Sequence, residues 1–195
     1  MGENNVKIAI LLPCYNEERT IEKVINDFRQ ELPTAEIWVY DNNSSDNSFD
    51  LAKNAGALVR KVLQQGKGHV VRRMFRDIDA DCYVMVDADD TYPAEHIKDL
   101  IAPILAYEAD MVVGDRLSST YHKENKRPFH SFGNNLVCSL IKLLFAKKVT
   151  DVMSGYRAFS KVFVKSCPVL SPGFELETEL TLHALDKRMN LIEIP

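Results

Sequence analysis

A series of short apolar runs, separated by longer amphipathic segments, constrains the fold of this sequence most. The runs are Ile8–Leu12, Ile37–Tyr40, Ala57–Val62, Tyr83–Val86 and Met111–Val113. Apolar runs this short are typical of strands that are buried on both faces, as in parallel sheets. Amphipathic segments between such strands predict crossover helices. We therefore expect an α/β fold with a mostly parallel central sheet that is flanked by helices.

The longer segments are predicted to be helices. They are Glu17–Leu32, Ser48–Asn54, Gly68–Ile78, Ala94–Tyr107, Phe132–Ala146 and Phe174–Lys187. Pro103 is expected to kink the fourth helix, because proline removes a helical hydrogen bond. A last strand is predicted at Leu191–Ile194. Residues 115–130 are polar and without periodicity, which predicts a long mobile loop, and loops of that length in compact domains are usually functional.

Length, charge and cysteine spacing argue against several classes of protein. The 195 residues suit one domain, and a formal net charge of −4 argues against a nucleic-acid partner. No apolar run approaches the ~20 residues that span a bilayer, and the N-terminus lacks the basic start of a signal peptide. The 4 cysteines form no CxxC pair, which argues against a zinc ribbon and fits a reducing cytoplasm.

Polar and acidic residues directly follow three of the predicted strands. Pro13–Glu17 follows the first strand, Asp41 the second, and Asp87 and Asp89 the fourth. Ligands of open parallel sheets bind beyond the carboxyl ends of the strands, so we expect these residues at one edge. Asp87 and Asp89 point to the same side of an extended segment and can face one hard cation, Mg²⁺ or Mn²⁺. Asp41 can accept the ring N–H of a uracil or guanine base.

Some acidic residues have a simpler interpretation, and several known motifs are absent. Ser45 and Asp46 are better explained as caps of the next helix, and Glu17 and Glu18 can stabilise a first helical turn without touching a ligand. No GxGxxG, GxxxxGK[ST] or GxSxG occurs, which argues against dinucleotide binding, a P-loop and an α/β-hydrolase.

Six segments together resemble those of family-2 glycosyltransferases in order and approximate spacing. They are Pro13-Cys14-Tyr15-Asn16-Glu17, Asp41-Asn42-Asn43-Ser44-Ser45-Asp46, Gly66-Lys67-Gly68, Asp87-Ala88-Asp89, Gly114-Asp115-Arg116 and Ser154-Gly155-Tyr156-Arg157. The resemblance runs from Val6 to Pro195 and is strongest to the branch of dolichyl-phosphate mannose synthase and bacterial polyprenyl-phosphate glycosyltransferases. It implies the GT-A fold of nucleotide-diphospho-sugar transferases.

The resemblance also implies roles for individual residues. The residues implied to bind the nucleotide are Pro13, Tyr15, Glu17, Asp41, Lys67, Asp87 and Ala88. Asp87 and Asp89 would hold the metal, and Thr91 stands where the branch often has a glutamine, so water can take the place of a third ligand. Arg116 and Arg127 would hold an acceptor phosphate, and Arg157 would contact the diphosphate. The catalytic candidates are Asp89, Asp151, Arg116 and Arg157, with Asp151 near the acceptor.

The function implied by this resemblance is a metal-dependent, inverting transfer of a sugar from a UDP- or GDP-sugar to a polyprenyl phosphate (undecaprenyl or dolichyl). Residues 1–195 would form a single catalytic domain, cut before a membrane-associated segment, with residues 115–130 as the acceptor loop. The full-length protein would then work at the cytoplasmic, anionic face of a membrane. The alternatives are a soluble sugar or polysaccharide acceptor, a nucleotidyltransferase, and a non-catalytic nucleotide-binding module.

Overall fold

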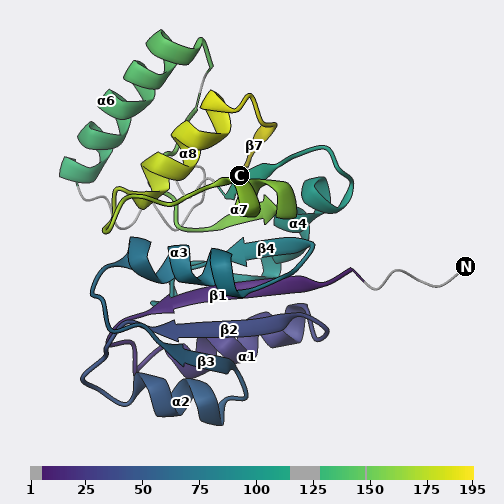
Figure 1. Cartoon of the computed structure of the whole chain (residues 1–195), viewed down its shortest axis with the longest axis vertical. Coiled ribbons are helices and arrows are strands. Elements are labelled where there is room, and N and C mark those ends of the chain that lie inside the picture. The colour runs from purple at the N-terminus through teal and green to yellow at the C-terminus, as the bar shows by residue number, and fades with distance from the viewer. Residues whose placement is uncertain (1–5, 115–127, 148) are drawn as a thin grey trace, which may run out of the picture.

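The centre of the molecule is a mostly parallel sheet, seen in a computed structural model that describes residues 6–114, 128–147 and 149–195 (Figure 1). Within these residues the sheet has seven strands in the order β3-β2-β1-β4-β6-β5-β7. The strands are β1 (Ile8–Cys14), β2 (Glu36–Asp41), β3 (Leu58–Lys61), β4 (Cys82–Met85), β5 (Met111–Gly114), β6 (Arg157–Ser160) and β7 (Leu191–Ile194). Strands β3, β2, β1 and β4 run parallel to one another, and β5 is parallel to β7. The predicted α/β architecture is confirmed.

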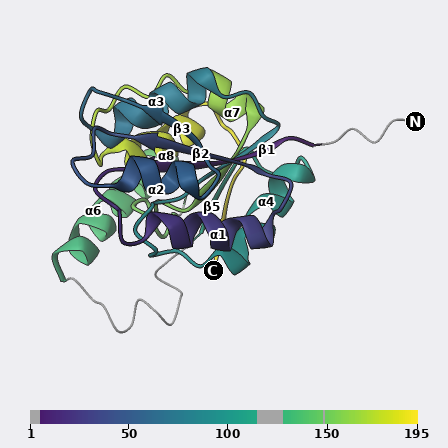
Figure 2. The same ribbon diagram turned by 90° about the horizontal axis from the view of Figure 1, so that it is seen from below.

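Helices cover both faces of the sheet. They are α1 (Ile21–Glu31), α2 (Ser48–Asn54), α3 (Lys67–Asp77), α4 (Ile97–Leu105), α6 (Pro128–Phe145), α7 (Lys161–Ser166) and α8 (Leu176–Asp186), with a short 3₁₀ turn, η1 (Ala94–His96), before α4. Figure 2 shows α1 and α4 on one side of the strands and α3 and α7 on the other. The sheet is therefore the middle layer of three, which is the arrangement that parallel strands require.

Strand β1 shows why its sequence is apolar without interruption. Ile10 and Leu12 belong to the core on the side of α1 and α4, whereas Ala9 and Leu11 belong to the core on the side of α3 and α7. Each of the four is 0% exposed. Alternate side chains of a strand point to opposite faces, so a strand covered on both faces has no polar position. A fully buried leucine or isoleucine contributes about 1.5–3 kcal/mol, so this strand anchors both layers.

The second half of the sheet differs from the sequence-based expectation at β6. This strand, together with α7 directly after it, was not predicted. β6 lies antiparallel between β4 and β5, with Ala158 opposite Val84 on one side and Val112 on the other. Its sequence, RAFS, begins with a buried arginine and is too short in apolar residues to indicate a strand. The strand is held by its two neighbours rather than by a local pattern.

Two predicted helices have different starts. The first begins at Ile21 instead of Glu17, because residues 17–20 form a turn in which the carbonyl of Glu17 accepts the N–H groups of Thr20 and Ile21. Helix α6 begins at Pro128 instead of Phe132 and takes up the last three residues of the predicted loop 115–130. The rest of that loop lies outside the described residues.

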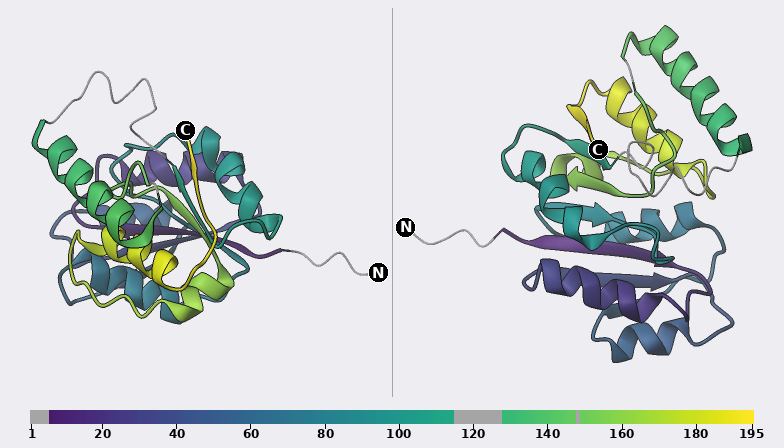
Figure 3. Two further views of the ribbon diagram at one scale, coloured as in Figure 1. Left: turned by 90° about the horizontal axis from the view of Figure 1, so that it is seen from above. Right: turned by 180° about the vertical axis from the view of Figure 1, so that it is seen from behind.

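Helix α6 lies outside the three layers, beside α8 (Figure 3). A small apolar cluster contains Ile141 of α6 with Val149 and Val152, and Leu185 of α8 packs against it. Leu140, Leu143 and Leu144 on the same helix are exposed. Among the described residues, no helix has the length and apolar character that crossing a membrane requires.

Candidate active site

Three neighbouring parallel strands, β2, β1 and β4, bring their carboxyl ends to one edge of the sheet. The chain leaves each strand through a residue with left-handed backbone: Asn16 after β1 (φ 57°), Asn43 after β2 (φ 63°) and Asp90 after β4 (φ 62°). Asn and Asp tolerate this conformation better than other residues with a side chain, because they bond to the local backbone. These sharp turns place the segments after the strands next to one another.

Side chains tie the turn after β1 to the turn after β2. The N–H of Glu17 donates to the hydroxyl of Ser48 at 2.7 Å, and the N–H of Ser45 donates to the side-chain oxygen of Asn16 at 2.9 Å. Asp46 accepts the N–H groups of Ser48 and Glu18. Burial would raise the pKa of Asp46, but these hydrogen bonds outweigh it and lower the pKa. The N-cap of α2 is Asn47 and not Ser45 or Asp46, although Asp46 accepts the N–H of the first helical residue, Ser48.

Asp41 and Asn42 end β2 inside the protein. Asp41 is 0% exposed, and its Oδ2 accepts the N–H of Ser44 at 3.3 Å. Its Oδ1 is buried and, within the part of the chain that the structure describes, has no hydrogen-bond partner. Asn42 donates to the carbonyls of Val62 and Gln64 and accepts the N–H of Gly66 at 2.7 Å. Asn42 therefore holds the loop that leads to α3 against the end of β2.

The carboxylates after β4 have different surroundings. Asp87 Oδ1 accepts Lys67 Nζ at 2.5 Å, and the same ammonium reaches Oε1 of Glu177 on α8 at 2.6 Å. Asp89 is exposed, and its Oδ1 accepts the N–H of Thr91 at 3.1 Å. Burial alone would lower the pKa of Lys67, but the charges of Asp87 and Glu177 outweigh it and raise the pKa. The edge therefore holds one screened carboxylate and one that is open to solvent.

The carboxyl group of Glu17 lies within the electrostatic influence of the carboxylates that follow the other strands. Partial burial raises the pKa of Glu17, a hydrogen bond from Thr20 opposes the rise, and the negative charges of Asp89, Asp46 and Asp87 add to it. In the described ranges, no group of three His, Cys, Asp or Glu residues is arranged to hold a metal ion by itself. Asp87 and Asp89 nevertheless fit Mg²⁺ or Mn²⁺, since these cations take one or two carboxylates and complete their shell with phosphate oxygens and water.

Other predicted nucleotide-binding residues line the same edge. Tyr15, directly after β1, is 52% exposed, and Pro13 within the strand is partly exposed. Ala88 is buried, and its carbonyl accepts the hydroxyl of Thr20 at 2.7 Å. The structure therefore brings Pro13, Tyr15, Glu17, Asp41, Lys67, Asp87, Ala88 and Asp89 to one edge.

Arg157 begins β6 opposite Met85, the last residue of β4, but its guanidinium group is not free, contrary to the expected diphosphate contact. It is 0% exposed, and it donates to the carbonyls of Ser154 and Val152, each at 2.8 Å, and to the hydroxyl of Thr181 at 2.9 Å. The guanidinium group has no solvent contact in this arrangement, so binding of a diphosphate would require it to move. Arg157 instead fixes the segment before β6 to α8.

Asp151 is also 0% exposed, and its Oδ1 accepts the N–H of Met153 at 2.9 Å. In this arrangement its carboxylate is covered by protein and has no solvent contact. Arg116 and Arg127, the predicted phosphate contacts, lie outside the described residues.

Sequence reasoning missed three residues of this region. The sequence leaves Glu177 equally open to a place on the acceptor side and to a solvated helix surface, shows Asn42 only as part of a motif, and does not mark Tyr92. The phenol of Tyr92 accepts the N–H of Gly155 at 2.8 Å, and Gly155 lies directly against Asp87. No local pattern marks these residues, because their partners are distant in the sequence.

The mostly parallel sheet with carboxylates at its strand ends has counterparts among solved structures. Glucosyl-3-phosphoglycerate synthase from Mycobacterium tuberculosis, in complex with Mn²⁺, uridine diphosphate and glucosyl-3-phosphoglycerate, superposes with a TM-score of 0.81 at 24% identity. The match covers 97% of this chain and 69% of that one. It shows the GT-A fold.

The chain belongs to glycosyl transferase family 2, whose family model matches residues 9–167. It is similar to protein RfbJ of Shigella flexneri (49% identical over 63% of this chain and 98% of that protein). It is also similar to glycosyltransferase AglJ of Haloferax volcanii, with 33% identity over 96% of this chain and 61% of that protein. Dolichol-phosphate mannosyltransferase of Pyrococcus furiosus is 27% identical over 97% of this chain and 56% of that protein. The chain thus spans little more than half the length of the last two. The predicted membership of family 2 is confirmed, and with it the class of enzyme, a glycosyltransferase.

Proposed function

We propose that this glycosyltransferase moves a sugar from a nucleoside-diphosphate sugar to a polyprenyl phosphate, with a divalent cation and with inversion at the anomeric carbon. The observation that carries the proposal is the acidic strand-end edge, in which the exposed Asp89 lies near Asp87 and Glu17 in a family-2 fold. The polyprenyl phosphate is supported by the relative from Pyrococcus furiosus, which is named a dolichol-phosphate mannosyltransferase.

The donor base is proposed to bind at Asp41 and Tyr15. The unpartnered Oδ1 of Asp41 is an acceptor without a donor, and a uracil or guanine ring N–H would supply one. Tyr15 follows Cys14, which stands opposite Asp41 in the sheet, and its exposed ring offers a surface for the base. Pro13, Glu17 and Ala88 complete the base and ribose side, and Lys67 is proposed to reach the diphosphate.

The cation, Mg²⁺ or Mn²⁺, is proposed to be held by Asp89, with Asp87 beside it. When bound, it would neutralise the charge that develops on the leaving nucleoside diphosphate. The protein's own contribution is position: the left-handed turn at Asp90 and the hydrogen bond from Thr91 hold the Asp89 carboxylate at the mouth of the edge. The superposed synthase, whose complex contains Mn²⁺ and uridine diphosphate, supports this proposal by its fold.

The acceptor side is proposed to bind a lipid phosphate at a membrane face. An acceptor phosphate is already anionic at pH 7, because its second pKa is about 6, so it needs positioning more than a general base. Arg116 and Arg127 are proposed to position it. Helix α6 exposes Leu143 and Leu144 beside Lys142, a combination that suits contact with an anionic membrane surface.

The acceptor proposal is tested by the choice of acceptor and by Asp151→Asn, once urea unfolding has shown that this variant, whose carboxylate is buried, folds like the parent protein. A lipid-phosphate acceptor needs no base, so this variant should lose less than about tenfold in rate, far less than Asp89→Asn. The measurement is transfer from a panel of UDP- and GDP-sugars to undecaprenyl phosphate in vesicles, against soluble sugars without lipid. Equal and total loss in both variants, or transfer to soluble sugars alone, would contradict the lipid-phosphate acceptor.

A further inference from the structure

Lys67 forms a buried bridge between the metal-site carboxylate Asp87 and a carboxylate on another helix, Glu177. Its ammonium lies 2.5 Å from Asp87 Oδ1 and 2.6 Å from Glu177 Oε1. The side chains of Lys67 and Glu177 are 11% and 6% exposed, whereas that of Asp87 is 29% exposed. The bridge joins the start of α3, the end of β4 and α8. Two carboxylates share one cation, which leaves a net charge of −1 within the bridge.

The backbone on both sides of Lys67 is packed closely against residues 171–172. A Cβ on Gly66 would come within 2.3 Å of the carbonyl oxygen of Pro172, and one on Gly68 within 1.8 Å of that of Ser171. The N–H of Gly68 also donates to Pro172 at 3.0 Å. Glycine on both sides of Lys67 lets the two chain segments touch. Rotation of the lysine side chain is therefore the motion available to the bridge.

Lys67 occupies one of the two oxygens of Asp87, Oδ1. The other oxygen, Oδ2, faces Gly155, where an added Cβ would lie 2.3 Å away, so that side is filled by backbone. A divalent cation that approaches Oδ1 meets the lysine ammonium on the same oxygen. Two positive charges about 4 Å apart repel each other by several kcal/mol near a protein surface, so both cannot remain there without another anion.

We propose that Lys67 is an internal counter-ion, which holds Asp87 until a divalent cation and a nucleoside diphosphate bind together, and that Glu177 keeps the released ammonium beside the diphosphate. This inference rests on the proposed metal role of Asp87 and Asp89. The diphosphate supplies the anion that lets the cation and Lys67 share the site. The structure thereby couples cation binding to nucleotide binding, and the cation alone binds weakly.

The test measures binding of Mn²⁺ alone to the nucleotide-free chain, by the loss of the free-ion electron paramagnetic resonance signal. Lys67→Gln should bind Mn²⁺ at least tenfold more tightly than the parent protein. In an Asp87→Asn background, Lys67→Gln should raise the Mn²⁺ affinity less than threefold, because the substitution no longer frees a carboxylate. Arg73→Gln, which removes the same charge from the exposed face of α3, should leave the affinity within twofold. Equal gains with and without Asp87 would overturn the proposal.

Two further variants separate the possible failures. Asp89→Asn should abolish Mn²⁺ binding; if it binds like the parent protein, the proposed metal site itself is wrong. If Asp89→Asn loses binding but Lys67→Gln gains nothing, the counter-ion role alone is wrong. Should Lys67→Gln fail to fold, Glu177→Gln decides: Lys67 would then rest on Asp87 alone, and Mn²⁺ affinity should fall at least threefold. Unchanged or tighter binding in this variant would contradict the proposal.

Discussion

The two halves of the sheet place their charged residues in opposite ways. On the side of β1, β2 and β4, the carboxylates follow the strands, and Asp89 is exposed at the edge. On the side of β6, Arg157 and Asp151 are both 0% exposed and bond to their own chain. The carboxylates of the first half are proposed to bind a ligand, whereas Arg157 and Asp151 stabilise the fold of the second half. Asp41 is buried as well, but its Oδ1 has no hydrogen-bond partner among the described residues, so free hydrogen-bonding capacity or exposure separates the two roles.

The largest expected effect is at the exposed carboxylate. Asp89→Asn should lower the rate of sugar transfer on the order of 10³-fold, because the proposed cation stabilises the leaving group by several kcal/mol. The free energy of unfolding should change by less than about 0.5 kcal/mol, since the side chain is exposed. Steady-state rates and urea unfolding measure both quantities. If Asp89→Asn lowers the free energy of unfolding but not the rate of transfer, Asp89 stabilises the fold as Arg157 does, and the two halves of the sheet do not differ in this way.

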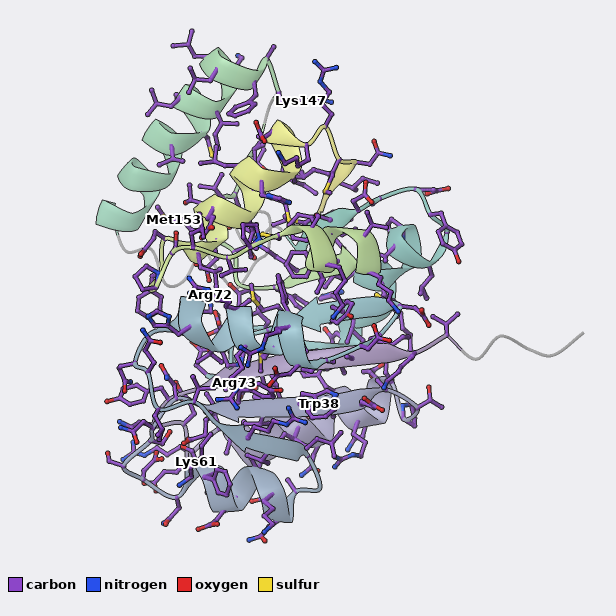
Figure 4. The ribbon with its side chains drawn as sticks, in the orientation of Figure 1. Trp38, Lys61, Arg72, Arg73, Lys147 and Met153 are labelled. Atoms are coloured by element: carbon purple, nitrogen blue, oxygen red, sulfur yellow. The ribbon has the colours of Figure 1, made fainter. Side chains whose placement is uncertain are left out.

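The reverse pattern is expected at Arg157. Replacing it with methionine should lower the free energy of unfolding by about 3 kcal/mol or more, because the carbonyls of Ser154 and Val152 and the hydroxyl of Thr181 lose their donor inside the protein. Urea unfolding measures the loss. Arg73→Met, at an exposed position of α3, is the control and should change little; Arg73 is labelled beside that helix in Figure 4. If Arg157→Met is as stable as the parent protein but inactive, the result would support the predicted contact between Arg157 and the diphosphate.

Gly68 tests the contact that joins the halves. Gly68→Ala should cost about 1–3 kcal/mol of stability, since its Cβ would come within 1.8 Å of the backbone oxygen of Ser171. Gly114→Ala is a matched comparison, because its Cβ would meet a tyrosine ring carbon at 3.3 Å, which can yield. Calorimetric unfolding compares the two. Equal costs would mean that residues 171–172 can withdraw from α3.

The smallest effect concerns pH. Glu179 accepts the N–H groups of Leu170 and Ser171. Its burial would raise its pKa, but these bonds outweigh it and hold the pKa below the ordinary value of 4.5. The ionised form therefore stabilises the fold above pH 4.5, and that contribution is lost as the pH falls through the lowered pKa. Glu179→Gln should show a shallower loss of melting temperature between about pH 5 and pH 3 than the parent protein. If the melting temperature falls equally steeply with pH in both proteins, the ionised Glu179 carboxylate does not stabilise the fold.

The sequence predicts the half of the sheet with β1, β2 and β4 better than the half with β6. Ser48–Asn54 and Leu191–Ile194 lie where their patterns predict, and the strand-end carboxylates meet, because parallel strands carry their own signal in short apolar runs. β6 has no such signal, since its neighbours on both sides decide its position. Arg157 matches a family segment by order alone, and order does not report whether a side chain is covered.

Glu177 illustrates the same limit. It is 110 residues from Lys67 in sequence, and only the packing of α8 against the start of α3 brings the two together. The charge pattern of α8 gives equal weight to Glu175, Glu177 and Glu179, although Glu177 is buried and the other two are not. Side-chain roles that depend on such long-range contacts require the three-dimensional structure.

The proposed donor site is the central claim, and thermal unfolding with nucleotides tests it most directly. UDP and GDP would each be added with Mn²⁺ or with EDTA to the parent protein and to Asp89→Asn. A ligand at about 100 times its dissociation constant stabilises by roughly 2.7 kcal/mol, a shift of several degrees. We predict a Mn²⁺-dependent shift with one nucleotide, absent in Asp89→Asn. No shift with either nucleotide on folded protein, or an equal shift in the variant, would contradict the site.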